Sequence, residues 1–289
     1  MHGVDTAAVA WWVWPIALFA VTFALGIIAV VAGVGGGVLF VPVVASFFPF
    51  SLDFVRGAGL LLALAGTLAA GPVLLRSGMA NLRLVMPLAL AGSIASIAGA
   101  LVGLSVPADL LQTALGIVVI GVALLIWRAK GSDRLGIEES DPLGELLRLK
   151  GRFHDSAHGA HVDWRTHQTP AGLAVFAAIG FLGGVFGLGA GFANVPALNL
   201  LMAAPLKVAV GSSGLIISII NSAAAWIYIN SGAVLPLLVV PSILGVVLGS
   251  RIGARLLHAV PAPVVRRLVI AVMLIAGTRA LLRGLGAWT

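Results

Sequence analysis

Long apolar stretches, separated by charged and turn-forming residues, dominate the chain. Most have close to the ~20 apolar residues with which a helix crosses a bilayer, but the first stretch of each half is longer. This pattern predicts an all-α polytopic membrane protein. The stretches are Trp11 to Phe48, Val55 to Leu75, Leu84 to Leu104, Leu110 to Trp127, Ala171 to Ala204, Val208 to Ile229, Leu235 to Leu257 and Val264 to Leu282.

Glycines and prolines show that the second four stretches copy the first four. At a fixed offset of 154 residues they coincide without a gap, as in Gly33 and Gly187, or Pro87 and Pro241. The sequence therefore predicts two membrane repeats, 1–128 and 170–289. The hydrophilic stretch between them, 129–169, is expected to be a cytoplasmic linker.

Charge and composition limit the class of protein. Of the 289 residues, 60% are hydrophobic and 9% are charged, whereas soluble chains carry about 25% charged residues. Between Arg128 and Arg165, seven basic and seven acidic residues cancel, so the net charge of +7 comes from cations at the ends of apolar stretches. Such cations are topology signals and do not form a nucleic-acid surface. We expect a multi-pass protein of the cell (cytoplasmic) membrane whose partners are lipid and a small substrate.

The distribution of cations also bears on topology. If the first stretch of each half enters and leaves on one side, fourteen Lys and Arg residues lie on one face and three on the other. If it crosses once, the split is about ten to seven. The positive-inside rule favours the hairpin. We expect inverted repeats, each with a broken Gly-rich helical hairpin and three transmembrane helices, an architecture typical of secondary transporters.

Two glycine-rich segments are the first candidate binding elements. Clustered glycines disfavour continuous helix, and non-helical backbone at membrane depth requires protein or a water-filled cavity around it. Freed N–H groups at the start of the following short helix would favour an anion. The alternative is that the glycines only allow close helix packing. The candidates are Gly33, Gly35, Gly36, Gly37 and Pro42 in the first half and Gly187, Gly189, Gly191 and Pro196 in the second.

Neutral polar residues of the second half are further candidates. Asn194 and Asn199 follow the glycine segment and are expected to face the interior, while Ser212, Ser213 and Asn221 lie on the next stretch. Hydroxyls and amides bind an oxyanion without holding it too tightly. The same groups also form hydrogen bonds within or between helices, which is the alternative role.

Charged and metal-binding side chains are few in the expected spans, and their roles differ. Arg56 borders the expected outer mouth, where it either attracts anions or anchors a helix end at the interface. No Asp or Glu falls within an expected span, so a cation would lack counter-charges and an anion fits better. His154, His158 and His161 have the spacing of one helix face, but we interpret them as part of a solvated linker. No cofactor and no metal site are expected.

Several motifs together resemble the TauE/SafE sulfite exporter family of membrane permeases. They are the glycine clusters followed by proline, Ala209 to Ser213, Asn230 to Gly232, and Gly249 to Leu256. The resemblance covers residues 16–128 and 170–282. It implies a permease for sulfite or related sulfonates, with both glycine–proline motifs, Ser212 and Ser213 in its site. Two features depart from the family: Arg56 to Gly59 replaces a hydroxyl-bearing element, and the linker is long.

We therefore predict a secondary transporter that moves small sulfur-containing anions by alternating access around a midplane site. Three alternatives remain. One is transport of another small organic anion, such as a carboxylate. A second is a membrane enzyme acting on a lipid or sulfur substrate, which would need a carboxylate, His or Cys inside the membrane, so we do not expect an enzyme. The third is a non-transporting assembly partner, whose glycine turns would lie apart and face lipid.

Overall fold

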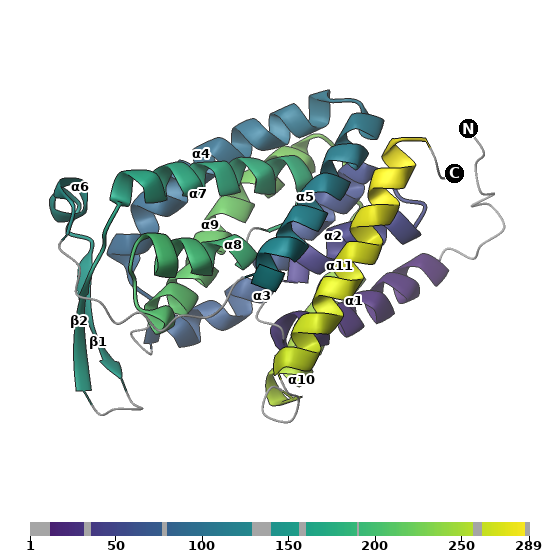
Figure 1. The fold of residues 1–289 in the computed structure, drawn as a ribbon. Coiled ribbons are helices and arrows are strands. Elements are labelled where there is room, and N and C mark those ends of the chain that lie inside the picture. The colour runs from purple at the N-terminus through teal and green to yellow at the C-terminus, as the bar shows by residue number, and fades with distance from the viewer. Residues whose placement is uncertain are drawn as a thin grey trace.

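The computed structural model describes residues 12–31, 36–76, 80–128, 140–155, 160–189, 191–256 and 262–286. These residues form a bundle of helices with one short β-hairpin (Figure 1). The elements are α1 (Val13–Val31), α2 (Gly36–Phe47), α3 (Leu52–Arg76), α4 (Leu82–Ser105), α5 (Ala108–Arg128), α6 (Pro142–Leu146), β1 (Lys150–Asp155), β2 (Ala160–Arg165), α7 (Thr169–Phe186), α8 (Gly191–Pro196), the π-helical turn η2 (Ala197–Leu201), α9 (Leu206–Asn230), α10 (Pro236–Leu256) and α11 (Ala262–Gly284).

The helix bounds recur at the offset found among the glycines and prolines. Adding 154 to the bounds of α3 gives those of α9, and α5 and α11 begin at equivalent residues, Ala108 and Ala262. In the same way α1 corresponds to α7, α2 to α8 with η2, and α4 to α10. Each half therefore contributes the same succession of long and short helices.

Equivalent helices pack side by side in opposite directions. In α3, Gly57 lies beside Tyr228 of α9. Ten residues further along α3, the Thr67 hydroxyl accepts a hydrogen bond of 2.8 Å from Ser218, which comes ten residues before Tyr228. Sequence positions thus rise along α3 as they fall along α9, so the two helices are antiparallel.

The pair α5 and α11 has the same antiparallel arrangement. Gly116 approaches Leu281, whereas Gly284, later in α11, approaches Thr113, earlier in α5. Each contact is so close that an added Cβ would lie within 2.6 Å of a backbone atom or a side-chain hydroxyl. The two central helix pairs of the bundle therefore share one relative orientation.

The remaining long helices pair across the halves. The helix α1 packs against α10 and α4 packs against α7, and the latter pair runs side by side in Figure 1. A Cβ at Gly26 would lie 2.7 Å from the Val246 carbonyl oxygen, and one at Gly180 would lie 2.2 Å from that of Gly92. These glycines let two helix backbones touch, as small residues do in membrane bundles.

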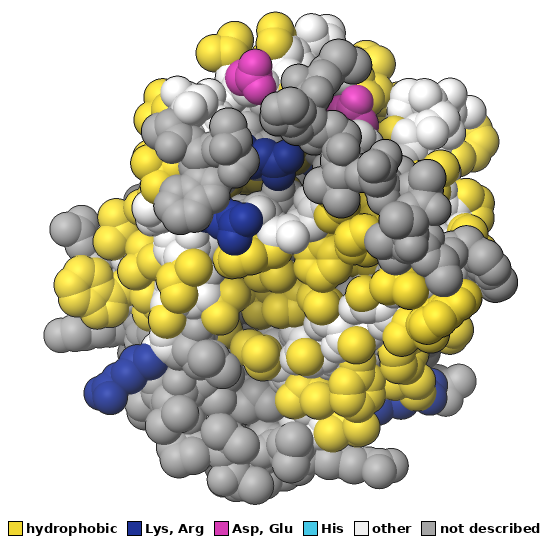
Figure 2. All heavy atoms as spheres, turned by 90° about the vertical axis from the view of Figure 1, so that its right-hand side faces the viewer, with side chains coloured by type: hydrophobic (Ala, Val, Ile, Leu, Met, Phe, Trp, Pro, Cys, Tyr) yellow, Lys and Arg dark blue, Asp and Glu magenta, His cyan; other side chains and the backbone are white. Residues whose placement is uncertain are grey.

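The outer surface is suited to lipid. Among the described residues, four helical segments are long and apolar enough to cross a membrane: Leu82–Ser105, Thr169–Phe186, Val208–Asn230 and Pro236–Gly253. Large side chains such as Leu90 and Ile94 remain 63% and 65% exposed. Figure 2 shows a face covered by hydrophobic side chains, with charged side chains above and below this band. The predicted all-α membrane protein is therefore confirmed.

Six helices begin two or three residues before the apolar stretches indicated, and in two of them the added residues include a carboxylate. The helix α3 starts at Leu52 and α5 at Ala108, so Asp53 and Asp109 lie within their first turns. The free N–H groups of a first turn favour acidic side chains. A stretch defined by apolar residues ends at such a side chain and so omits the first turn. The expected spans therefore stopped short of two carboxylates that belong to the helices.

The linker contains a small folded unit, made of α6 and the antiparallel hairpin of β1 and β2, which lies at one end of the bundle (Figure 1). His154 and His161 are cross-strand partners in this hairpin. The helical spacing considered for these histidines therefore does not apply, and His158 lies outside the described residues. No group of three His, Asp or Glu residues in the described part of the chain could hold a metal.

Asp141 joins this unit to the bundle. Its carboxylate accepts hydrogen bonds from the Gly144 N–H at 3.2 Å, which caps α6, and from the N–H and hydroxyl of Thr169 at 3.1 and 2.7 Å. Burial disfavours the charged form of Asp141. The hydrogen bonds from Thr169 and Gly144 outweigh burial and hold the pKa of this carboxyl below its ordinary value of 3.8.

We expect Asp141→Ala to destabilise the linker unit by about 1–2 kcal/mol, because it removes a helix cap and both bonds to Thr169. A lowered folded-state pKa means that the carboxylate stabilises the unit above its ordinary pKa, and that this contribution is lost as the pH falls through the folded value. Hydrogen exchange of residues 142–165 measures the loss. Asp163→Ala, on the exposed face of the hairpin, is the control, and equal protection in the two variants would contradict the prediction.

Candidate functional site

The second glycine segment separates α7 from α8. Gly187 and Gly189 have φ angles of +67° and +56°, in the left-handed region that glycine adopts without strain. The Gly187 N–H donates to the Gly183 carbonyl at 2.8 Å and so closes the last turn of α7. The chain thus leaves the helix through a turn that residues with a Cβ adopt only at a cost.

The two glycine segments meet at the middle of α3. A Cβ on Gly37, near the start of α2, would lie 2.8 Å from the Gly59 carbonyl oxygen and 3.3 Å from that of Leu188. A Cβ on Gly59 would lie 2.6 Å from the Gly187 carbonyl oxygen. Three backbones are therefore in contact at one place. Sequence reasoning did not single out Gly59, although small residues in an apolar helix are a signal of close backbone approach.

Asn221 of α9 lies beside this contact. A Cβ on Gly189 would lie 2.6 Å from Cβ of Ala63 and 3.2 Å from Nδ2 of Asn221. Asn221 is 1% exposed, and its Nδ2 has no hydrogen-bond partner among the described residues. A buried donor without a partner costs about 1–3 kcal/mol. The amide is therefore available to a ligand.

Asn194 of α8 is the second unpartnered amide. It is 0% exposed, and within the described part of the chain neither its Oδ1 nor its Nδ2 forms a hydrogen bond. The helix α8 packs against α9, which carries Asn221. Nearby Asn199 is buried too, but its Nδ2 donates to the Ala204 carbonyl at 2.9 Å. The two buried asparagines therefore differ: the Asn199 amide has a hydrogen-bond partner, whereas the Asn194 amide has none among the described residues.

Pro196 explains the change of helix type at this point. It lies at the end of α8, and η2 follows directly. Proline has no N–H and its ring displaces the preceding turn, so the regular hydrogen-bond ladder is interrupted. Single π-helical turns are frequent at functional sites. Its counterpart Pro42 is buried within α2.

The serines of α9 lie at a different level from Asn221. Ser212 is 0% exposed, and its Oγ accepts a hydrogen bond of 3.1 Å from the N–H of Asn81, the N-cap of α4. Ser213 is 4% exposed. Nine helical residues separate Ser212 from Asn221, which places them about 13 Å apart along the axis. The serines therefore lie toward the end of the bundle that carries the linker unit.

Arg56 is buried near the start of α3, beside the Gly187 turn, and its Nε has no hydrogen-bond partner among the described residues. It is 1% exposed, and its Nη1 donates to the carbonyls of Gly103 at 2.9 Å and Val185 at 3.0 Å. Its Nη2 pairs with Asp53, and its guanidinium lies 5.5 Å from the ring centroid of Tyr228. An interfacial anchor would keep its charge in water, so this anchoring role does not fit. The spacing of Asp53 and Arg56, three residues apart on a helix, was the overlooked signal.

Comparison with known proteins decides the family. The family model described as "Sulfite exporter TauE/SafE" matches residues 18–280. The chain belongs to the TauE/SafE sulfite exporter family. "Probable membrane transporter protein ORF9" of Sinorhizobium sp. is 28% identical over 269 residues, 91% of each chain. "Probable membrane transporter protein YunE" of Bacillus subtilis (strain 168) is 30% identical over 120 residues, 42% of this chain and 44% of that protein. No solved structure matches the chain.

The predicted membership of the TauE/SafE family is thus confirmed, and this TauE/SafE protein is a membrane transporter. The structure brings Gly37, Gly187 and Gly189 together with Asn221, and the Gly187 backbone lies against that of Arg56, whereas Ser212 lies apart. Gly36 and Gly191 begin α2 and α8. Gly33 and Gly35 lie outside the described residues.

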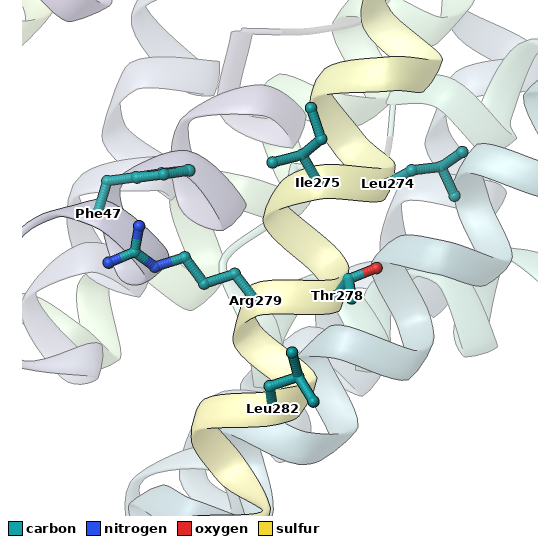
Figure 3. Close-up of a pocket in the computed structure, with 6 residues that line it drawn as sticks. All are labelled: Phe47, Leu274, Ile275, Thr278, Arg279 and Leu282. Atoms are coloured by element: carbon teal, nitrogen blue, oxygen red, sulfur yellow. The ribbon is translucent and has the colours of Figure 1, made fainter. Parts of the chain in front are cut away.

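The TauE/SafE chain also has a groove on its outer surface, between the end of α2 and α11. It encloses about 480 Å³ and is lined by Phe47, Leu274, Ile275, Thr278, Arg279 and Leu282 (Figure 3). The Arg279 guanidinium lies 4.4 Å from the ring centroid of Phe47, and Ile275 is 62% exposed. This mostly apolar, open groove suits an acyl chain better than a small anion.

Proposed function

We propose that this TauE/SafE transporter moves small sulfur-containing anions, such as sulfite or organosulfonates, across the cytoplasmic membrane by alternating access. The observation that carries the proposal is a set of two buried, unpartnered amides: that of Asn221, beside the contact of the glycine segments, and that of Asn194 on α8, which packs against the helix of Asn221. Their Nδ2 groups can donate to anion oxygens. The free Oδ1 of Asn194 can accept from the O–H of a protonated anion or from water.

Neutral donors suit a substrate that must also leave. A fixed guanidinium would hold a carboxylate by paired hydrogen bonds, but the Nη atoms of Arg56 already donate to two carbonyls and pair with Asp53. The site therefore offers an anion neutral amide donors and no free Nη of a guanidinium. The close approach of Gly37 to Leu188, both buried, speaks against an assembly partner with lipid-facing glycine turns.

Inverted repeats complete the proposed mechanism. Equivalent helices α3 and α9, and α5 and α11, are antiparallel, which supports two halves of opposite orientation. Each half would then consist of a broken hairpin and three crossings, with the linker in the cytoplasm. Both halves contribute broken helices to one place, as in transporters whose substrate lies between repeats. Rocking one half against the other would expose the Asn194 and Asn221 amides to each side in turn.

We expect Asn194→Leu to lower sulfite flux into proteoliposomes at least tenfold while raising the free energy of unfolding by about 1–3 kcal/mol, because it removes two buried groups without partners. Flux and thermal unfolding of the purified protein measure both effects. The matched control is Asn199→Leu, which breaks the bond to Ala204 and is expected to lower stability.

Two outcomes would count against the proposal. Wild-type flux in Asn194→Leu would show that this amide does not belong to the substrate site. Equal flux of acetate and sulfite in the wild-type protein would favour a general organic-anion transporter.

A further inference from the structure

A second cavity, separate from the transport site, lies in the linker unit where α6 meets the hairpin. It encloses about 300 Å³ and is lined by Ser140, Gly144, Glu145, Arg148, Lys150 and Arg165. Three of these six residues are cationic and one, Glu145, is acidic. Among the described residues the ion pairs are Arg56 with Asp53 and Arg152 with Asp163, so no cation of the cavity belongs to either.

The backbone brings these cations together at a local cost. Lys150 and Arg165 are direct cross-strand partners, and like charges at opposite positions destabilise a hairpin. Arg148 has a φ of +52°, in the left-handed region that residues with a Cβ adopt rarely. Strained backbone conformations and like-charge pairs of this kind cluster at binding sites, where a ligand or the surrounding fold compensates for their cost.

Buried neighbours fix the backbone that carries the three cations. Leu149, between Arg148 and Lys150, is 1% exposed, and Trp164, before Arg165, is 5% exposed. The Leu149 N–H donates to the Gly144 carbonyl at 2.8 Å, and its own carbonyl accepts from the N–H of Thr166 at 3.1 Å. The cavity is therefore built on an ordered framework, which reduces the ordering cost of binding.

The cavity is also connected to the transport helices. A Cβ on Gly151, next to Lys150, would lie 2.8 Å from Nδ2 of Asn81. The N–H of Asn81 donates to Oγ of Ser212 on α9. A ligand that fixes Lys150 would thus act on the contact between the first turn of α4 and α9.

We propose that this cavity binds a tetrahedral phosphate or sulfate oxyanion and that its occupancy stabilises the contact between the linker unit and Asn81. Arg148, Lys150 and Arg165 supply the positive charge, and the Ser140 hydroxyl can add a hydrogen bond. The bound anion would separate the Lys150 and Arg165 charges, which otherwise repel each other. Free phosphate or sulfate and the phosphate of a lipid headgroup share this chemistry.

Calorimetric titration of the purified full-length protein with sulfate and phosphate tests the proposal, with chloride at equal ionic strength as the blank. We expect saturable binding that weakens at least about tenfold in Lys150→Gln/Arg165→Gln. Arg152→Gln, on the same strand but outside the cavity, should bind like the wild type. Hydrogen exchange around Asn81 should slow when the anion binds.

Nanodiscs separate the two sources of the oxyanion. Slower exchange at Asn81 in discs that contain phosphatidylglycerol than in pure phosphatidylcholine, without a response to free sulfate, would identify the lipid headgroup. The proposal fails if neither source binds, or if Arg152→Gln weakens binding as much as the double variant. Because Lys150→Gln/Arg165→Gln also removes a like-charge pair, its unliganded linker unit should be no less protected than that of the wild type.

Discussion

Gly187→Ala is expected to destabilise the transporter by roughly 2–5 kcal/mol and to abolish transport. The φ of +67° alone makes a Cβ unfavourable here. The added Cβ would also lie 2.3 Å from the carbonyl oxygen and 2.5 Å from Cα of Arg56. These are backbone atoms in the interior of α3, so the clash can be relieved only by moving a helix that carries the site.

A matched variant separates the two causes. Gly232 has a φ of +73°, but no atom lies within 4 Å of the position of its Cβ. Gly232→Ala should therefore cost about 1–2 kcal/mol, the conformational part alone. Thermal unfolding of both variants and anion flux in proteoliposomes provide the comparison. Equal losses of stability in the two variants would show that the contact between Gly187 and Arg56 does not add to the cost of the substitution.

Arg56→Leu is expected to lower the free energy of unfolding by about 3–5 kcal/mol. The substitution leaves the carbonyls of Gly103 and Val185 without the guanidinium that now bonds to both, and it leaves the Asp53 carboxylate without its partner. These bonds join α3 to α4 and α7, so their loss loosens three helices at once. Chemical or thermal unfolding of the purified protein measures the effect.

Asp53→Asn is the control for this variant. Because the side chain of Asp53 is 49% exposed, and Arg56 keeps both carbonyl partners, we expect a loss of only about 1 kcal/mol. If Arg56→Leu were no more harmful than Asp53→Asn, the carbonyl bonds would not be the main role of Arg56. Normal stability combined with lost flux would instead make Arg56 a substrate-binding residue.

Much of the fold follows from local pattern and from repetition. Apolar length predicted the helices, and the offset of 154 residues predicted that α3 and α9 would have equivalent bounds. The first turn of α3 was missed because Asp53 and Arg56 neutralise each other only once the helix has formed. The hairpin of the linker was missed because its charges indicated a solvated segment, although Ala160, Val162 and Trp164 of β2 alternate with polar residues as in a half-buried strand.

The site could be predicted only in part. Burial of Asn194 and Asn199 follows from their residue type in an apolar segment, but the sequence does not show that Asn199 bonds to Ala204 while Asn194 bonds to nothing. That difference depends on where the chain turns after η2. Ser212 was grouped with Asn221 although their separation along α9 places them at different levels. The role of Gly59 depends on a contact with Gly187, far away in sequence.

The pairing of each long helix with a helix of the other half has a consequence for biosynthesis. The most extensive helix pairings, α1 with α10, α4 with α7, α5 with α11 and α3 with α9, each join one half to the other. When the first half has emerged from the ribosome, none of its long helices α1, α3, α4 and α5 has yet met its main partner, and the glycine grooves of α1 and α4 are still open. Contacts so distant in sequence form slowly and only after synthesis is nearly complete. The chain is therefore two halves by ancestry but one cooperative unit in folding.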